Sequence, residues 1–272
     1  MASQVERAER FLELHEAGSP LLMPNAWDVG SARLLASLGF QALATTSSGH
    51  AATLGRLDGS VARDEVLEHC AALVAAADLP VSADLESGFG ETPDEVAETV
   101  RLAAATGLAG CSVEDATALP DEPIRPVEAA AERVIAAAEA AHGGPVRLVL
   151  TARAENHVHG RSDLPDTIDR LQRYQAAGAD VLFAPGVVAP EDLRRLVAEV
   201  DVPVSVLTFP GCPTVAEMAA IGVSRVSVGG AFAFAALGAM VAAAEELRDQ
   251  GTLGFLTGAR AGGRAARAAF GP

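Results

Sequence analysis

Charged and hydroxyl side chains gather at the ends of four consecutive apolar segments of the sequence. Three of them, Asp84, Glu86 and Glu114, are carboxylates, which would raise one another's pKa if they converged without a counter-charge. A divalent cation with oxygen ligands, Mg²⁺ or alternatively Mn²⁺, would remove that conflict. The pattern therefore predicts a metal site at these three residues. The alternative is that they cap helices or form salt bridges with Arg153.

Arg153 and a run of hydroxyl residues predict an anionic ligand at the same place. Arg153 follows the mostly apolar stretch 146–152, and a buried guanidinium needs either carboxylate partners or an anionic substrate. The run 45–50 (TTSSGH) offers hydroxyls and successive backbone N–H groups, which suit a carboxylate. These features indicate a site for a small acid.

Eight short segments of β type, separated by Ala-rich segments of helical period, must position these residues. This alternation is typical of βαβ units, and eight such segments in 272 residues predict a closed (β/α)8 barrel, the TIM-type fold. An open doubly wound sheet is the competing architecture, but no Gly-x-Gly-x-x-Gly follows the first segment. In a barrel, catalytic residues lie at the carboxyl ends of the strands, where these polar residues are found. The expected strands are 21–26, 42–48, 80–85, 110–116, 146–154, 181–186, 203–208 and 225–230.

Local signals mark the helices between these strands. Thr92-Pro93-Asp94-Glu95 predicts a helix start, with a Thr cap, Pro in the first turn and Glu three residues after the cap. The clearest helical segments are 94–106, 127–141, 166–177 and 191–200.

The composition limits the possible functions. The formal net charge of −16 argues against a nucleic-acid groove, which needs clustered Lys and Arg. No apolar run approaches the roughly 20 residues that span a bilayer, and the charged N-terminus is unlike a secretory signal. The three cysteines form no CxxC pair, so neither a disulfide framework nor a zinc site is expected. We expect a cytoplasmic protein with one domain over 1–256 and a partly disordered tail over 257–272.

The strand-end motifs, taken in order, resemble those of the isocitrate lyase/phosphoenolpyruvate mutase superfamily over nearly the whole chain. The resemblance implies a β/α barrel whose last helix is exchanged between subunits of a homodimer or homotetramer. It also implies Mg²⁺ at Asp84 and Glu86, with Glu114 nearby. The motifs are PNAWD (24–28), TTSSG (45–49), SADLESGFG (82–90), SVED (112–115), TARAEN (151–156), AAGAD (176–180) and SVGG (227–230).

The same resemblance implies roles in binding and catalysis. Arg153 would stabilise the oxyanion of a 2-oxo acid, Asp58 falls where the family has a further acidic residue near the metal, and Glu114 completes the implied catalytic set. The implied substrate-binding residues are Trp27, Thr46, Ser47, Ser48, Gly49, Arg153 and Glu155.

The loop after the fourth expected strand departs from the family pattern. Isocitrate and methylisocitrate lyases carry Lys-[Lys/Arg]-Cys-Gly-His there, and phosphoenolpyruvate mutase carries a Lys and an Asn-Ser pair, whereas residues 116–123 (ATALPDEP) contain no Cys, Lys, Asn or His. We therefore expect a Mg²⁺-dependent lyase that decarboxylates or cleaves a C–C bond of an oxaloacetate-like 2-oxo acid through an enolate. The alternatives are a phosphonopyruvate or phosphoenolpyruvate enzyme of phosphonate metabolism and a non-catalytic 2-oxo-acid-binding protein.

Overall fold

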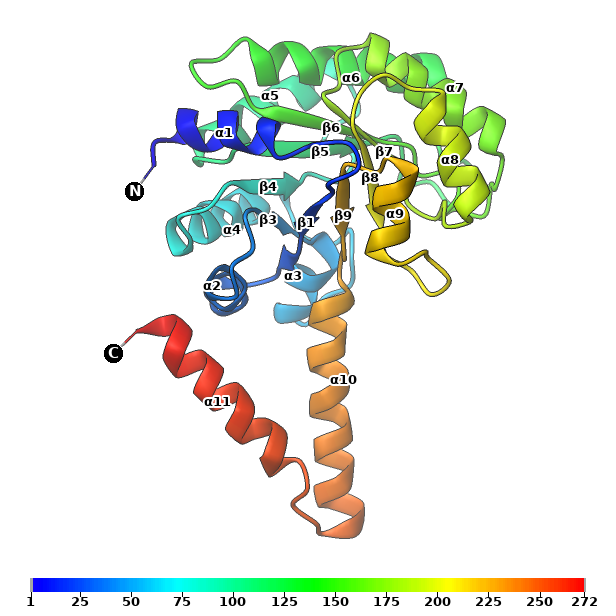
Figure 1. Cartoon of the computed structure of the whole chain (residues 1–272). Coiled ribbons are helices and arrows are strands. Elements are labelled where there is room, and N and C mark those ends of the chain that lie inside the picture. The colour runs from blue at the N-terminus through cyan, green and yellow to red at the C-terminus, as the bar shows by residue number, and fades with distance from the viewer. Residues whose placement is uncertain (1, 272) are drawn as a thin grey trace.

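In the computed structural model, which describes residues 2–271, nine parallel strands follow one another around a nearly closed ring (Figure 1). The first expected strand is split at Pro24, which has no backbone N–H to donate. Its first half, β1, pairs with β9 and its second half, β2, pairs with β3, so this segment joins the two ends of the ring. The predicted (β/α)8 TIM-type barrel is confirmed. The strands are β1 (Leu21–Met23), β2 (Asn25–Ala26), β3 (Leu43–Thr45), β4 (Val81–Asp84), β5 (Gly110–Glu114), β6 (Val149–Arg153), β7 (Val181–Phe183), β8 (Val204–Leu207) and β9 (Arg225–Ser227).

Helices alternate with the strands and cover the outside of the ring. The four clearest predicted helices are found within two residues of their expected ends. The start of α5 is as predicted: the Thr92 hydroxyl accepts the Glu95 N–H at 3.3 Å, and the Glu95 carboxylate accepts the Thr92 N–H at 2.9 Å. The helices are α1 (Gln4–Glu13), α2 (Val29–Ser37), α3 (Ser47–Thr53), α4 (Arg63–Ala76), α5 (Pro93–Ala105), α6 (Val127–His142), α7 (Leu164–Ala176), α8 (Pro190–Ala198), α9 (Val215–Ile221), α10 (Ala231–Glu245), the π-helix Glu246–Gln250 and α11 (Leu256–Phe270).

Small aliphatic side chains fill the core. Leu43, Leu150 and Leu182 are fully buried on three strands, and alanines and valines from the strands and helices pack around them. Phe11 and Tyr174 are the fully buried aromatic side chains of the described chain, in keeping with an aromatic content of 4%. The barrel therefore places its strand ends on a rigid, closely packed base.

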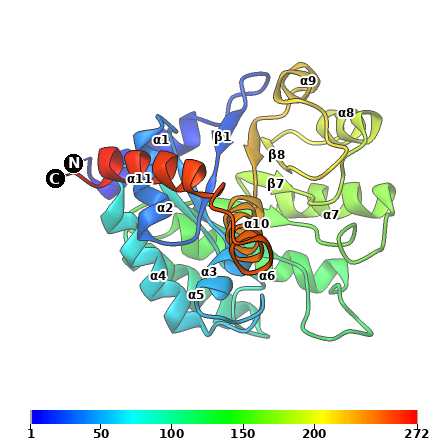
Figure 2. The ribbon, with the colours of Figure 1, turned by 90° about the horizontal axis from the view of Figure 1, so that it is seen from below.

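The structure differs from the expected boundaries at two places. The strand expected over 42–48 ends with β3 at Thr45, because the Thr46 hydroxyl accepts the Gly49 N–H and caps α3. The tail expected to be partly disordered from residue 257 forms α11, whose Ala and Arg residues favour a helix. This helix lies beside α2 (Figure 2).

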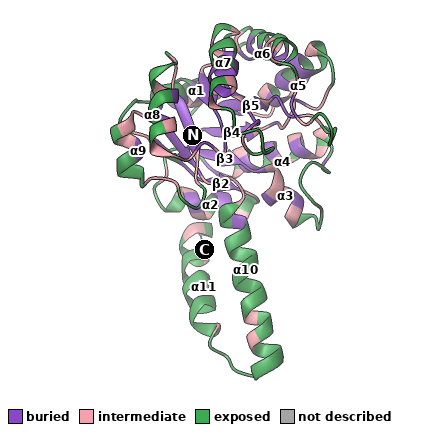
Figure 3. Cartoon of the chain, turned by 90° about the vertical axis from the view of Figure 1, so that its right-hand side faces the viewer, coloured by how far each residue is buried: buried purple, intermediate pink, exposed green. Residues whose placement is uncertain are grey.

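α10 and α11 form an arm that projects from the barrel, and most of its surface is exposed (Figure 3). Phe234, Met240 and Val241 of α10 are each more than half exposed, an amount of apolar surface that a soluble chain normally covers. No helix within residues 2–271 has the length and apolar character needed to cross a membrane. Exchange of the last helix between subunits stays a prediction.

Candidate functional site

Two adjoining cavities open at the carboxyl ends of the strands. The smaller one, of about 180 Å³, reaches into the barrel and is lined by residues of all nine strands. The larger one, of about 480 Å³, lies over the loops that follow β4, β5 and β6. Ser47, Asp58 and Arg153 line both cavities, so the two form one continuous site. Its position is the one expected for catalysis in a barrel.

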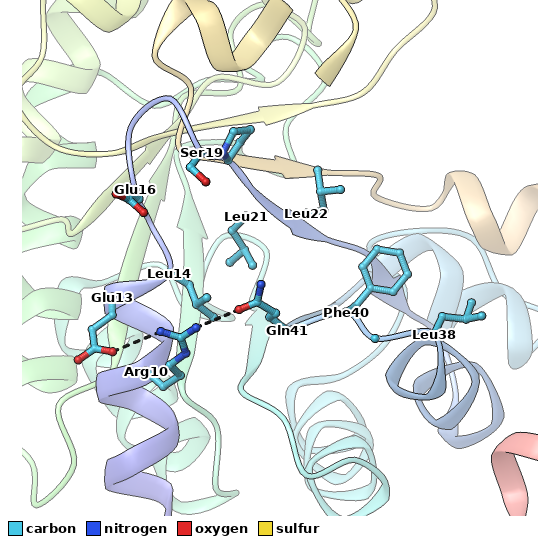
Figure 4. Close-up of a pocket in the computed structure, with 12 residues that line it drawn as sticks. Arg10, Glu13, Leu14, Glu16, Ser19, Leu21, Leu22, Leu38, Phe40 and Gln41 are labelled. Carbon is cyan, nitrogen blue, oxygen red and sulfur yellow. Dashed lines mark hydrogen bonds and ion pairs between the residues drawn. The ribbon is translucent and has the colours of Figure 1, made fainter. Parts of the chain in front are cut away.

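A third cavity, of about 510 Å³, lies elsewhere, beside α1 and the amino end of β1 (Figure 4). The charged groups there contact one another: Arg10 lies 3.5 Å from the Glu13 carboxylate and donates to the Gln41 side chain at 3.0 Å. Its lining residues lie away from the carboxyl ends of the strands, so its size alone does not make it the candidate site.

Arg153 lies at the centre of the site among three carboxylates. Its Nη1 is 2.8 Å from Asp84 Oδ1, and its Nη2 is 3.1 Å from Glu114 Oε2. Both Nε and Nη2 lie 2.8 Å from Glu155 Oε1. The guanidinium also lies over the Phe183 ring, 5.3 Å from its centroid. The structure thus brings together four predicted site residues.

Burial and these contacts set the pKa values. Burial alone would lower the pKa of Arg153, but Glu155, Glu114 and Asp84 raise it well above its ordinary value. Burial raises the pKa of Glu114 well above its ordinary value, and burial also raises that of Glu155, while Arg153 opposes both shifts. Arg153 therefore remains a cation, as a group that stabilises negative charge must.

Side chains alternate along a strand, so a strand that continued to Glu86 would place Glu86 on the same face as Asp84, but the structure does not do so. β4 ends at Asp84, and Glu86 lies in the following turn with φ of 49°, a left-handed conformation that is rare for a residue with a side chain. The Glu86 carbonyl accepts the Glu114 N–H at 3.0 Å, which holds the turn. Burial, followed by the charges of Asp84 and Asp58, raises the pKa of Glu86 to about 7. Strain of this kind is typical of functional sites.

The carboxylate oxygens that line the site are ligands of the type that a divalent cation prefers. Asp84, Glu114 and Glu155 contact the Arg153 guanidinium, Asp58 and Glu86 line the same site, and the Glu86 carboxylate has no hydrogen-bond or ion-pair partner within residues 2–271. Such an excess of carboxylate oxygen is what Mg²⁺ binds, with water completing its shell. In the described chain no three acidic, His or Cys side chains form a ready ligand cluster, because Arg153 lies between Asp84 and Glu114.

The predicted carboxylate-binding run divides between two places. Thr46, Ser47 and Ser48 line the smaller cavity, and the Thr46 and Ser48 hydroxyls lie 3.2 Å apart. Gly49 and Trp27 instead line a separate apolar cavity of about 230 Å³ against α10. A Cβ at Gly49 would lie 2.6 Å from the Thr46 methyl and 3.0 Å from Trp27, so this glycine allows close packing. The structure therefore does not place Trp27 at the polar site.

Several polar residues of the site were not singled out from the sequence. Asn25 accepts the N–H groups of Val228 and Gly229 and joins the rim from β2 to β9. Arg225, on β9, lines the smaller cavity from within the barrel. The sequence pattern could have identified Arg225. Arg225 and Ser227 are two residues apart on an expected strand, so their side chains face the same side, and this pattern indicates the interior.

His50 of α3 and His69 of α4 form a stacked pair, with ring centroids 3.7 Å apart. Burial, then the neighbouring His50, lowers the pKa of His69 to about 4.

A folded-state pKa of His69 below the unfolded value of about 6.5 favours the neutral ring, so the stability that the ring contributes is present above pH 6.5 and is lost toward pH 4. We expect wild type to lose about 2 kcal/mol more unfolding free energy than His69→Asn between pH 7 and 4.5, measured by urea unfolding. Parallel pH profiles of the two proteins would contradict this assignment.

The comparisons with known proteins agree with the geometry. A model of the family described as phosphoenolpyruvate phosphomutase matches residues 11–248. A crystal structure of a provisionally described lyase/mutase from Burkholderia cenocepacia J2315 is 51% identical and has a TM-score of 0.91, with 93% of this chain and 92% of that chain covered. A provisionally described phosphonomutase from the same organism is 38% identical with a TM-score of 0.85, covering 92% of this chain and 100% of that chain. Oxaloacetate decarboxylase 1 of Pseudomonas putida (strain W619) is 30% identical over 258 residues, covering 87% of this chain and 83% of the relative. The chain therefore belongs to the isocitrate lyase/phosphoenolpyruvate mutase superfamily, as its strand-end motifs predicted.

Proposed function

We propose that this protein is a Mg²⁺-dependent lyase that decarboxylates, or cleaves a C–C bond of, a small oxaloacetate-like 2-oxo acid. The observation that carries the proposal is the position of Arg153: a permanent cation at the mouth of a cavity large enough for a small acid, held by Asp84, Glu114 and Glu155. The similarity to an oxaloacetate decarboxylase supports this substrate class.

Arg153 keeps an N–H group of Nη1 for the substrate. A guanidinium carries five N–H groups. Nε donates to Glu155 and Nη1 donates one N–H to Asp84, while Nη2 forms ion pairs with Glu114 and Glu155. The remaining N–H of Nη1 has no partner within residues 2–271, and we assign it to the keto oxygen of the substrate. When the C3–C4 bond breaks, its electron pair forms the enolate, CO₂ leaves, and this donor stabilises the new negative charge.

The other residues bind and orient. Thr46, Ser47 and Ser48 would hold the substrate carboxylate with their hydroxyl groups. Asp84 and Glu86 would hold the divalent cation, with Asp58 and Glu114 in the same cluster. When bound, the cation supplies a Lewis acid for the substrate's carboxylate and keto oxygens. The loop 116–123 provides no acid, so we expect water to protonate C3 of the enolate.

The decisive assay is pyruvate release from oxaloacetate. We expect release at a rate at least about 100-fold above that of the same concentration of free Mg²⁺, and loss of that rate when EDTA removes the metal. A rate equal to that of free Mg²⁺ alone would count against the lyase proposal.

A second function, on phosphonopyruvate, is favoured by the similarity to a provisionally described phosphonomutase. The same assay series separates the two. Turnover of phosphonopyruvate in preference to oxaloacetate would assign the protein to phosphonate chemistry. Saturable binding of both acids without turnover would identify a 2-oxo-acid-binding protein.

A further inference from the structure

Arg225 is a buried cation without a counter-ion, in the interior of the barrel. Its side chain is 3% exposed, and it donates to Ser205 Oγ at 2.9 Å and to Thr151 Oγ1 at 3.1 Å. Its third partner is His15 Nε2, at 3.1 Å. The neighbouring Nδ1 of His15 lies 2.8 Å from the Phe11 carbonyl, to which it can donate, so His15 is a neutral acceptor. No carboxylate in residues 2–271 lies within ion-pair distance of Arg225.

This guanidinium lies one layer below Arg153. Arg225 starts on β9 and reaches Thr151 on β6, and β7 and β8 lie between these two strands, so the side chain crosses the barrel interior. Thr151 and Arg153 are two residues apart on β6 and face the same side. The smaller cavity is lined by both arginines and extends between the two layers.

The walls of this cavity offer further unused donors. Ser82 and Ser227 line it and are almost fully buried, and neither hydroxyl has a hydrogen-bond partner in the described part of the chain. Their hydroxyl oxygens are not enclosed by the protein, so a ligand in the cavity can reach them. Arg153 faces three carboxylates and Arg225 faces none, so Arg225 is the cation of this cavity whose charge is uncompensated.

We propose that Arg225, with Ser82 and Ser227, binds one carboxylate of a dicarboxylic substrate that reaches into the smaller cavity beneath Arg153. This inference rests on the proposed function and assigns a binding group to one of the two carboxylates of an oxaloacetate-like substrate. Burial, and then the nearby charge of Arg153, lowers the pKa of Arg225 to about 9, which still leaves it charged at neutral pH. A carboxylate would compensate a charge that neutral acceptors only solvate.

The test measures malonate binding by calorimetry in the presence of EDTA. Malonate has two carboxylates and no 2-oxo group, so it reports on the cavity and is not turned over. We expect one malonate per wild-type chain and about tenfold weaker binding to Arg225→Gln. Arg225→Lys, which keeps the charge, should fall between them. Arg195→Gln removes an exposed arginine of α8 and the same net charge, and it should bind like wild type.

Absence of malonate binding to wild type, or equal affinity in Arg225→Gln, would overturn the inference and leave the oxaloacetate assay untouched. Failure of the oxaloacetate assay with Arg225-dependent malonate binding would overturn the proposed activity instead. If Arg225→Gln does not fold, the Nε–H resonance of Arg225 in wild type, assigned by its loss in Arg225→Lys, should shift with malonate. An unmoved resonance would also overturn the inference.

Discussion

Replacement of Arg153 by lysine is expected to lower kcat/KM for oxaloacetate at least about 100-fold, which corresponds to roughly 2.7 kcal/mol of transition-state stabilisation. An ammonium carries three N–H groups, and the three carboxylates around position 153 can accept all of them. No donor would remain for the enolate oxygen. The charge that keeps Asp84, Glu114 and Glu155 compensated would stay in place, so the variant should fold.

Arg153→Lys is measured against two references. Urea unfolding should show a loss of stability of about 1 kcal/mol, far less than expected for a neutral residue, which would leave three buried carboxylates uncompensated. Arg195→Lys, at an exposed position of α8, should keep wild-type kcat/KM. If Arg153→Lys retains activity within threefold of wild type, the guanidinium does not contact the reacting oxygen.

The barrel was predictable because its signals are local and repeated. Most strands are short β-branched or aliphatic runs, and most helices have a capping residue or a glycine at one end, so each unit can be predicted independently of the others. The boundary at Thr46 was missed because a Thr-Ser-Ser run suits both a strand end and a helix cap, and only the contact with Gly49 decides. The helix α11 was missed because its three internal glycines lower the helical signal, whereas its contact with α2 is a tertiary effect.

The site was predictable in its members and less so in their arrangement. Strand-end position brought Asp84, Glu114, Arg153 and Glu155 together as expected. The turn at Glu86 could not be read from a period-two pattern, because the strand ends two residues earlier and the backbone takes a left-handed conformation. Whether Arg153 or a metal ion compensates a given carboxylate depends on distances of a few ångströms, which sequence spacing does not fix.

Asp115 is the clearest case of a residue whose role needed the structure. It follows Glu114, so its side chain faces the helical layer, and there its Oδ2 accepts the Tyr174 hydroxyl at 2.6 Å and Arg170 Nη1 at 3.0 Å. Its Oδ1 accepts the Glu155 N–H at 2.8 Å. Since Glu155 holds Arg153, this buried carboxylate supports the reactive site from behind.

Replacement of Asp115 by asparagine is expected to lower the unfolding free energy by about 3 to 5 kcal/mol, because it removes the buried negative charge that Arg170 faces. The new amide also turns one acceptor into a donor among groups that are themselves donors. Asp166→Asn is the matched control: Asp166 contacts the same arginine at 2.8 Å, but its side chain is 38% exposed, so the loss should be about 1 kcal/mol or less. If urea unfolding gives equal losses of unfolding free energy for the two variants, then Asp115 compensates the charge of Arg170 no more than the exposed Asp166 does. In that case the Asp115–Arg170 ion pair would contribute no more than the exposed Asp166 pair, and Asp115 would position Glu155 through the backbone hydrogen bond alone.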